Sequence, residues 1–298
     1  MNSPRFGRIL TAMVTPFTPD GSIDFDVAAK VARFLVEQGN EGLVVAGSTG
    51  EGTSLSDEEK LGLFTCVAQA VTVPVLAGST SSDTARSVAL TSQVAATGVA
   101  GVLATTPAYS RPSQAGIAAH LGAVADSTTL PVMLYDIPSR TGRKIASATT
   151  VDLVRAHANI VALKDASADL VSAAHTKAVL GGGLDLYSGD DGLLLPFMAV
   201  GAVGIVSVAA HWAAPEFVSI VCGVENGDWE QARVLNERIA QSCAFESTEA
   251  YPNPMPAKAA MRAMGFAVGE CRLPLGPATP ALDTAAGDIV AELRVARG

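Results

Sequence analysis

Apolar and polar positions along the chain follow two alternating periods. Short apolar runs rich in β-branched residues are separated by longer stretches with helical periodicity, and this pattern repeats up to about residue 225. The stretch 24–39, DFDVAAKVARFLVEQG, is typical of the second kind, because Val27, Val31 and Leu35 fall on one helical face and a glycine ends it. The apolar runs predict strands over residues 9–17, 42–47, 73–79, 100–107, 131–138, 160–166, 184–190 and 204–210.

Eight strand–helix units in succession predict an α/β fold, a closed (β/α)8 TIM barrel within residues 1–225. A doubly wound sheet is the alternative for such a pattern, but it usually has fewer strands. Beyond residue 225 the strand pattern stops while helical patterns continue, as in WEQARVLNERIAQSCA and DIVAELRVAR. We therefore expect residues 226–298 to form a C-terminal helical appendage. No low-complexity linker precedes it, so it should pack on the barrel or on an adjacent subunit.

The composition of the chain limits its possible partners. Of the 298 residues, 49% are hydrophobic and 16% charged, which excludes a disordered chain and suits strands buried on both faces. The formal net charge of −9, without a Lys/Arg cluster, argues against nucleic acid and against an anionic membrane surface. There is no apolar stretch of about 18 residues and no signal-peptide pattern, so we expect a cytoplasmic protein. The four cysteines lack CxxC spacing and should be reduced thiols.

The second strand candidate runs into a glycine-rich loop, VVAGSTGEGTSL (44–55). Its glycines come within one residue of the P-loop spacing, but Thr53 stands where that motif needs its lysine, and Glu51 would oppose a polyphosphate. The dinucleotide fingerprint also fails, because its second glycine would be Thr49. A nucleotide phosphate is therefore not the expected ligand of this loop.

Lys164 is the ionisable residue in the most unusual position, because it alone among the lysines closes an apolar strand candidate, IVALKDA (160–166). A buried ammonium is costly unless it is paired or neutral, and pairing with Asp165 is geometrically poor since neighbouring strand residues point to opposite faces. The carboxyl ends of barrel strands carry catalytic groups. A neutral lysine there can attack a carbonyl and form a Schiff base, and removing its proton at pH 7 costs about 4.6 kcal/mol.

The strand before Lys164 ends in YDIPSRTG (135–142), which offers two further candidates. Tyr135 is suited to proton transfer at the strand end, and the planar guanidinium of Arg140 is suited to a substrate carboxylate. Taken alone, a core tyrosine and a solvated loop arginine explain these residues equally well.

Together these motifs resemble a known family. The chain is similar, over nearly its whole length, to the dihydrodipicolinate synthase and N-acetylneuraminate lyase family of pyruvate-dependent class I aldolases. The segments that carry the resemblance are GSTGE (47–51), TPAYSRPSQ (106–114), YDIPSRTG (135–142), ALKDAS (162–167), SGDD (188–191) and NPMPAK (253–258).

The resemblance implies a set of roles. Lys164 would form the imine with pyruvate, Tyr135 would move protons, and Ser48 would connect Tyr135 to Tyr109. The tyrosine matching Tyr109 reaches into the adjacent subunit in this family, which implies at least a dimer and suggests a dimer of dimers. No metal or other cofactor is implied. The residues expected to bind substrate are Gly47, Thr49, Gly50, Arg140 and Val206, and Val206 is equally well explained as barrel core.

The resemblance also bears on the second substrate. Arg140 favours the members that condense pyruvate with L-aspartate 4-semialdehyde to 4-hydroxy-tetrahydrodipicolinate, at the entry to diaminopimelate and lysine biosynthesis. The Ser48-Thr49 pair is more usual among the sialic acid lyases, so an aldolase or dehydratase acting on sialic acid or a sugar-derived keto acid is the alternative. A non-catalytic binding paralogue is a further alternative, which the full set of site residues disfavours.

Two other groups of residues change the picture less. Asp190 and Asp191 suggest a divalent metal, but adjacent carboxylates point apart and helix capping before GLLLPFMAVG is the preferred explanation.

The positions that match the allosteric site of lysine-inhibited family members carry different residues here, so we expect weak or absent feedback by lysine. These positions are Asp57, Lys60, Ser82, Arg86 and Ala108.

Overall fold

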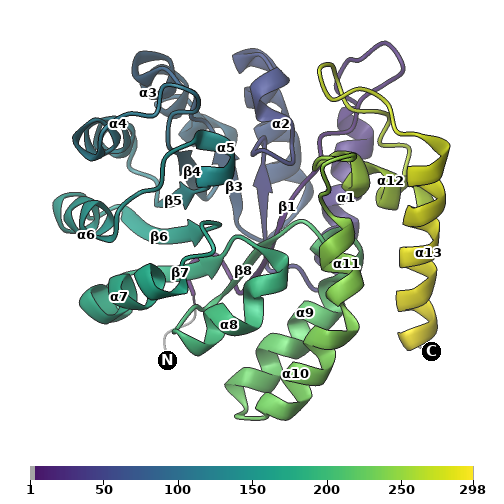
Figure 1. Ribbon diagram of the computed structural model, residues 1–298. Coiled ribbons are helices and arrows are strands. Elements are labelled where there is room, and N and C mark those ends of the chain that lie inside the picture. The colour runs from purple at the N-terminus through teal and green to yellow at the C-terminus, as the bar shows by residue number, and fades with distance from the viewer. Residues whose placement is uncertain (1–3, 298) are drawn as a thin grey trace.

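The computed structural model describes residues 4–297, which form a closed parallel barrel surrounded by helices (Figure 1). The strands follow one another in chain order, and β1 pairs with β8 to close the ring. They are β1 (Ile9–Ala12), β2 (Gly42–Val45), β3 (Val75–Gly78), β4 (Gly101–Thr105), β5 (Val132–Asp136), β6 (Ile160–Asp165), β7 (Asp185–Ser188) and β8 (Gly204–Ser207). Each lies within a range predicted from the apolar runs, so the predicted (β/α)8 barrel is confirmed.

Helices connect successive strands, and the predicted helix over 24–39 is α1, whose first turn is capped by Asp24 accepting from the Val27 backbone N–H at 2.9 Å. The α-helices up to the last strand are α1 (Phe25–Glu37), α2 (Asp57–Ala70), α3 (Thr84–Thr91), α4 (Gln114–Asp126), α5 (Pro138–Thr141), α6 (Ser147–Ala156), α7 (Leu170–Leu180) and α8 (Leu194–Ala199). Short 3-10 turns are η1 (Gly52–Ser54), η2 (Val94–Thr97), η3 (Gly181–Gly183) and η4 (Asp191–Leu193).

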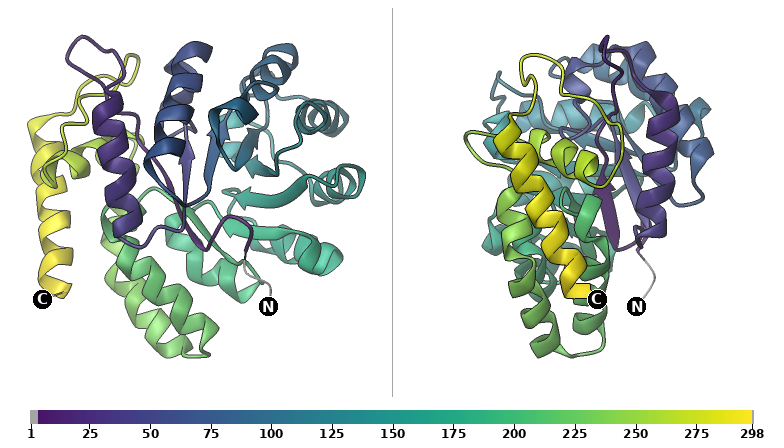
Figure 2. Two further views of the ribbon diagram at one scale, coloured as in Figure 1. Left: turned by 180° about the vertical axis from the view of Figure 1, so that it is seen from behind. Right: turned by 90° about the vertical axis from the view of Figure 1, so that its right-hand side faces the viewer.

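The chain continues beyond the last strand as helices only. These are α9 (Ala210–Glu225), α10 (Trp229–Arg238), α11 (Ala240–Phe245), α12 (Met255–Ala263) and α13 (Pro280–Arg297). Helix α12 packs against both α9 and α13, and Figure 2 shows α13 along one flank of the molecule. None of the helices within residues 4–297 combines the length and apolar character needed to cross a membrane.

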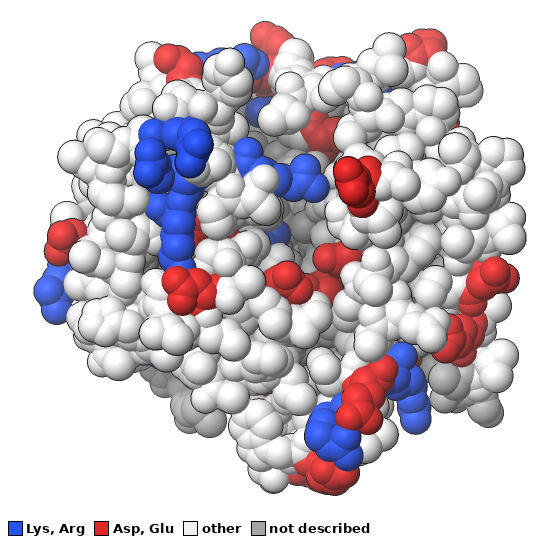
Figure 3. Space-filling model, viewed as in Figure 1, with Lys and Arg blue, Asp and Glu red and all other residues white. Residues whose placement is uncertain are grey.

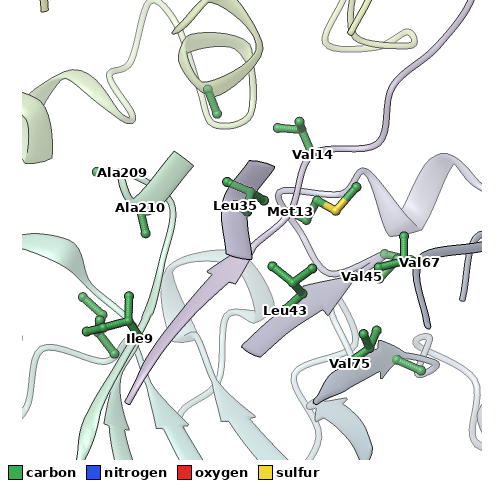
Figure 4. Close-up of a cluster of buried hydrophobic side chains, with 14 of the residues drawn as sticks. Ile9, Met13, Val14, Leu35, Leu43, Val45, Val67, Val75, Ala209 and Ala210 are labelled. Carbon is green, nitrogen blue, oxygen red and sulfur yellow. The ribbon is translucent and has the colours of Figure 1, made fainter. Parts of the chain in front are cut away.

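The alternation of side chains along the strands creates two buried layers. Leu43 and Val45 point outward from β2 toward the helices, whereas Val44 between them points into the barrel. Figure 4 shows the outer layer near β1, β2 and β3. Side chains from the strands, such as Ile9, and from the helices, such as Leu35, fill the space between the strands and the helices. The inner layer includes Tyr135 and Val206, so the barrel interior is packed up to the strand ends that carry the candidate site.

Candidate active site

Lys164 and Tyr135 meet at the carboxyl edge of the barrel. They occupy paired positions on the neighbouring strands β6 and β5, so both side chains point to the same face of the sheet. The Lys164 Nζ lies 4.2 Å from the centre of the Tyr135 ring, and both residues are 4% exposed. Asp165 does not pair with the lysine; its Oδ1 accepts from the Ser167 backbone N–H at 2.8 Å.

Burial sets the protonation of both groups. Loss of water around the amine lowers the pKa of Lys164 to about 8, with the charge of Arg140 acting in the same sense and those of Asp191 and Glu246 opposing it. Roughly a tenth of the molecules therefore carry the neutral amine at pH 7. Burial raises the pKa of Tyr135, against smaller effects of Arg140 and of a hydrogen bond with Ser48. The phenol thus keeps its proton at neutral pH and connects to the glycine-rich loop.

The glycine-rich loop follows β2 and is tightly turned. The N–H of Gly52 donates to the carbonyl of Gly47 at 3.0 Å, and Ala46 has a left-handed φ of 54°. A Cβ on Gly52 would lie 2.0 Å from the Ala46 carbonyl oxygen, so only glycine fits there. The buried Thr49 hydroxyl accepts from the Asn253 side-chain amide at 2.9 Å. The loop is therefore held both by its own turn and by the C-terminal segment.

Glu51 would repel a polyphosphate only if its carboxylate faced the ligand side of this loop, and in the structure it is buried instead. Its carboxylate Oε1 lies 2.7 Å from the Nζ of Lys258 on α12, and both side chains are almost fully buried. Its Oε2 accepts from the Arg272 backbone N–H at 2.8 Å, and the Lys258 Nζ also donates to the Glu270 carbonyl at 2.9 Å. The charge of Glu51 is therefore used to fasten the loop to the C-terminal helices.

Arg140 lies on the one-turn helix α5 above Tyr135 and is exposed. One of its terminal nitrogens, Nη2, donates to the Asn253 backbone carbonyl at 3.1 Å. Asn253 thus contacts both Arg140 and Thr49, and its own Oδ1 is buried without a partner among the described residues. Figure 3 shows a hollow in the face between α5 and α11, with basic and acidic side chains around it.

Tyr109 and Val206 take very different positions. Tyr109 is 97% exposed at a left-handed φ of 69°, so it does not join the buried Lys164 and Tyr135 of its own chain. Val206 is fully buried among the inner-layer side chains on β8. The predicted capping by aspartate is confirmed for Asp190, which accepts from the Gly192 N–H at 3.0 Å at the start of η4. For Asp191 the prediction is wrong, because its Oδ2 accepts from the N–H groups of Val208 and Ala209 in the segment between β8 and α9 and caps neither helix.

Sequence reasoning missed three residues of the site region. Asn253 belongs to NPMPAK, a motif noted for its resemblance but given no role, although its neighbouring prolines mark an irregular segment. Glu246 follows α11 and its charge acts on the Lys164 amine, but it is far in the sequence from any strand end that would draw attention to it. Lys258 sits in a helical pattern that does not reveal its burial. Within residues 4–297 no group of three or more His, Cys, Asp or Glu side chains is arranged to hold a metal ion.

The residues at the positions of the allosteric site form contacts of their own. Arg86 makes an ion pair with Asp57 at 3.0 Å, and the Ser82 hydroxyl donates to the Ala108 carbonyl at 3.2 Å. The neighbouring Lys60 is buried, and its burial lowers its pKa. An ion pair thus occupies this part of the surface, with a buried lysine beneath it.

Comparison with known proteins agrees with this geometry. A profile of the Dihydrodipicolinate synthetase family matches residues 5–293. The 4-hydroxy-tetrahydrodipicolinate synthase of Symbiobacterium thermophilum is 44% identical to this chain, over 98% of this chain and 99% of its own. The enzyme of the same name from Moorella thermoacetica is 45% identical, over 92% and 94%. A crystal structure of DHDPS from Cyanidioschyzon merolae with lysine bound superimposes with a TM-score of 0.95 at 37% identity, over 98% of this chain and all of that one.

Proposed function

Because the chain belongs to the dihydrodipicolinate synthetase family, we propose that it condenses pyruvate with L-aspartate 4-semialdehyde to give 4-hydroxy-tetrahydrodipicolinate. This reaction is the entry step of diaminopimelate and lysine biosynthesis, and it makes the protein a lyase of the class I aldolase type. The observation that carries the proposal is the buried amine of Lys164, which lies over the Tyr135 ring and has a pKa lowered to about 8. Such an amine is a nucleophile near neutral pH.

The chemistry begins with attack of the neutral Lys164 amine on C2 of pyruvate. Loss of water gives an iminium, which withdraws electrons from C3 and allows a C3 proton to leave. The resulting enamine attacks the aldehyde carbon of the second substrate and forms the new C–C bond. The amino group of that substrate then attacks C2, closes the ring and releases Lys164 as an amine. The imine supplies the electron sink, so the proposed reaction uses no metal or other cofactor.

Pyruvate is oriented by the glycine-rich loop. The N–H groups of Glu51 and Gly52 close the loop on itself, and we assign those of Thr49 and Gly50 to the pyruvate carboxylate, with Gly47 allowing close approach. The Thr49 hydroxyl, which accepts from Asn253, has its own proton left to donate. Tyr135 and Ser48 carry protons to and from the substrate, since a hydrogen bond already joins them. Val206 forms the apolar floor.

Arg140 binds the carboxylate of the aldehyde substrate. Its Nη2 is engaged with the Asn253 carbonyl at 3.1 Å, which fixes the guanidinium while the remaining N–H donors point elsewhere. A carboxylate held in a bidentate manner there would place its aldehyde toward Lys164. A neutral sugar has no carboxylate for Arg140 to bind, so this role favours the semialdehyde as the second substrate.

Tyr109 supports an assembled enzyme. A tyrosine that is 97% exposed at a left-handed φ leaves a large apolar ring in water unless a second copy covers it. We assign it to the proton path of the neighbouring subunit, in a homodimer that pairs into a tetramer. Sedimentation of the wild type and of Tyr109→Ala would test the assembly, and a wild type that sediments as a monomer at full activity would contradict it. The cytoplasmic location stays a prediction.

Feedback by lysine is proposed to be weak or absent. The Asp57–Arg86 ion pair and the buried Lys60 put two cationic groups where a cationic amino acid would bind. Inhibition is measured by titrating lysine to millimolar concentration in the steady-state assay. Strong inhibition at that concentration would refute this part of the proposal.

The proposed function is tested by a coupled assay with pyruvate and aspartate semialdehyde, next to a panel that includes sialic acid and sugar-derived keto acids. We expect turnover with the semialdehyde and a loss of about 100-fold in its kcat/KM for Arg140→Ala, because one charge-assisted bidentate contact is removed. Borohydride reduction with pyruvate should add mass to wild type and not to Lys164→Ala. If pyruvate forms an adduct but the semialdehyde is not turned over, the imine mechanism stands, and the second substrate is a sugar-derived acid instead.

A further inference from the structure

The residues that directly follow Tyr135 and Lys164 are aspartates that point away from the barrel interior. Side chains alternate along each strand, so Asp136 next to the inward-facing Tyr135 faces the helices, and Asp165 holds the paired position on β6. The two aspartates are 2% and 3% exposed. Buried carboxyl groups are costly unless donors meet them, so the partners of these aspartates indicate what they do.

Each aspartate holds the segment that follows its own strand. The Asp165 Oδ1 accepts from the Ser167 N–H and closes a short turn. The Asp136 Oδ1 accepts from the Ile145 backbone N–H at 3.0 Å, nine positions further along the chain. The residues between them include the one-turn helix α5 and therefore Arg140. The Asp136 carboxylate thus closes the loop that carries the guanidinium assigned to the second substrate.

This closed loop is stiff within itself. The Thr141 hydroxyl donates to the Ile137 carbonyl at 3.0 Å. The Gly142 N–H donates to the Pro138 carbonyl at 2.8 Å, where α5 ends. These bonds tie together the residues on both sides of Arg140, so a shift at either end of the loop displaces its guanidinium.

The two ends of the loop are held in different ways. The first end continues directly from β5, whereas the second end depends on side chains. Besides Asp136, the Gln114 amide of α4 holds this second end, since it donates to the Lys144 carbonyl at 2.8 Å and accepts from the Ala146 N–H at 2.9 Å. Ile145 itself is 2% exposed, so without Asp136 its N–H loses its acceptor in a buried place. Loss of the carboxylate therefore drives this end of the loop to move.

We infer that Asp136 is a positioning residue for the second substrate: by holding the Ile145 end of the loop, its carboxylate sets the place of Arg140. The inference rests on the proposed function, in which Arg140 binds the carboxylate of the semialdehyde. Asp136 faces the helices and not the Lys164 amine, so it takes no part in imine formation. Its removal should weaken use of the semialdehyde and leave the reaction with pyruvate intact.

Two variants of Asp136 test this role at pH 8 and saturating pyruvate. Asp136→Ala removes the acceptor, and Asp136→Asn keeps a neutral acceptor of the same size. The KM for the semialdehyde should rise about 10-fold to 30-fold in the first and about 3-fold in the second. The rate at which borohydride traps the pyruvate adduct should stay within about 2-fold of wild type in both. Asp24→Ala is the matched control, because it removes a bond of 2.9 Å from a backbone N–H to an aspartate on α1 and should leave this KM unchanged.

The pH dependence of the KM gives a second readout. Burial raises the pKa of Asp136 to about 7; the Ile145 hydrogen bond and the charge of Lys144 oppose this rise, and the charges of Asp165 and Asp169 add to it. The carboxylate is a stronger acceptor than the neutral acid, so it holds the loop better above pH 7. The ratio of the KM of Asp136→Asn to that of wild type should therefore be close to 1 at pH 6 and rise to about 3 at pH 8. A role in packing alone would give a ratio that does not change with pH.

A double-mutant cycle with Arg140→Ala shows whether Asp136 acts through Arg140. Once the guanidinium is absent, Asp136→Ala should lower the kcat/KM for the semialdehyde no further, because nothing remains to be displaced. An unchanged KM for Asp136→Ala, or equal losses with and without Arg140, would overturn the inference. If the alanine variant does not fold, Asp136→Leu takes its place, since leucine fills the buried space without accepting a hydrogen bond. A wild type that does not turn over the semialdehyde would instead overturn the proposed function.

Discussion

Two lysines of this chain are buried to a similar depth in different surroundings. Lys164 is 4% exposed with its Nζ 4.2 Å from the centre of an aromatic ring, and Lys258 is 1% exposed with its Nζ 4.1 Å from another. Lys258 meets the Glu51 carboxylate at 2.7 Å, whereas Lys164 forms no ion pair within residues 4–297. Pairing, more than burial, distinguishes the lysine that stabilises the fold from the one that reacts.

The physical reason lies in how the cost of burial is met. At Lys258 the carboxylate of Glu51 offsets the loss of water, although burial still lowers the pKa of the ammonium. At Lys164 the charges of Asp191 and Glu246 offset only part of the effect of burial, so the pKa of the amine falls to about 8. The ring of Tyr135 stabilises the ammonium by about 1–2 kcal/mol, which is less than the burial cost. The unpaired lysine can therefore give up its proton at little expense.

The largest expected effect is on activity when the unpaired lysine is replaced. Lys164→Met removes the nucleophile, so kcat/KM for the condensation should fall by about 10⁴-fold or more and no pyruvate adduct should form. Lys258→Met is the control, because it removes another buried lysine and should retain adduct formation at a temperature where it is folded. An adduct on Lys164→Met would show that another amine reacts.

The next effect is on stability when the paired lysine is replaced. Lys258→Met leaves the Glu51 carboxylate buried without its counterion, and the free energy of unfolding should fall by about 3–5 kcal/mol. Adding Glu51→Gln removes the orphaned charge while keeping an acceptor for the Arg272 N–H, and should restore most of that loss. Chemical denaturation of the three variants measures both changes. Equal denaturation midpoints for Lys258→Met and wild type would mean that the pair contributes nothing.

A smaller effect separates the two lysines by the sign of the stability change at pH 7 when each is replaced by methionine. Below pH 8 the folded state bears the full cost of the charged Lys164, about 3 kcal/mol, and this cost is relieved between pH 8 and 10.5, where only the unfolded chain keeps the proton. Lys164→Met should therefore be more stable than wild type at pH 7, and this advantage should shrink toward pH 10. Lys258→Met should be less stable than wild type at pH 7. The free energy of unfolding is measured for wild type and both variants at pH 7 and at pH 10. If the difference between Lys164→Met and wild type is the same at both pH values, the prediction is wrong.

The barrel half of the site could be predicted from the sequence for a physical reason. Strands buried on both faces leave continuous apolar runs, and the ends of those runs brought Lys164, Tyr135 and the glycine-rich loop to one edge. The role of Tyr109 came from resemblance alone and stays a prediction.

The C-terminal half of the site could not be predicted in this way. Every residue of α12 from Met255 to Met261 is buried, so its apolar pattern gives no sign that Lys258 differs from a surface lysine. Glu51 was interpreted as a repulsive charge because its partner lies more than two hundred positions away. The contact of Asn253 with Thr49 spans 204 positions, and no local period in the sequence can report it.

The smallest effect concerns the link between the two regions. The Asn253 side chain donates to the Thr49 hydroxyl at 2.9 Å and so joins the C-terminal segment to the loop that orients pyruvate. Asn253→Ala should raise the KM for pyruvate about 5-fold to 10-fold, with kcat changed less, since one neutral hydrogen bond contributes about 1 kcal/mol. A double-mutant cycle with Thr49→Val measures the coupling, which should be close to that value. If the two losses are strictly additive, the C-terminal helices stabilise the barrel but do not position its glycine-rich loop. The Lys258–Glu51 pair would then contribute to stability and not to pyruvate binding.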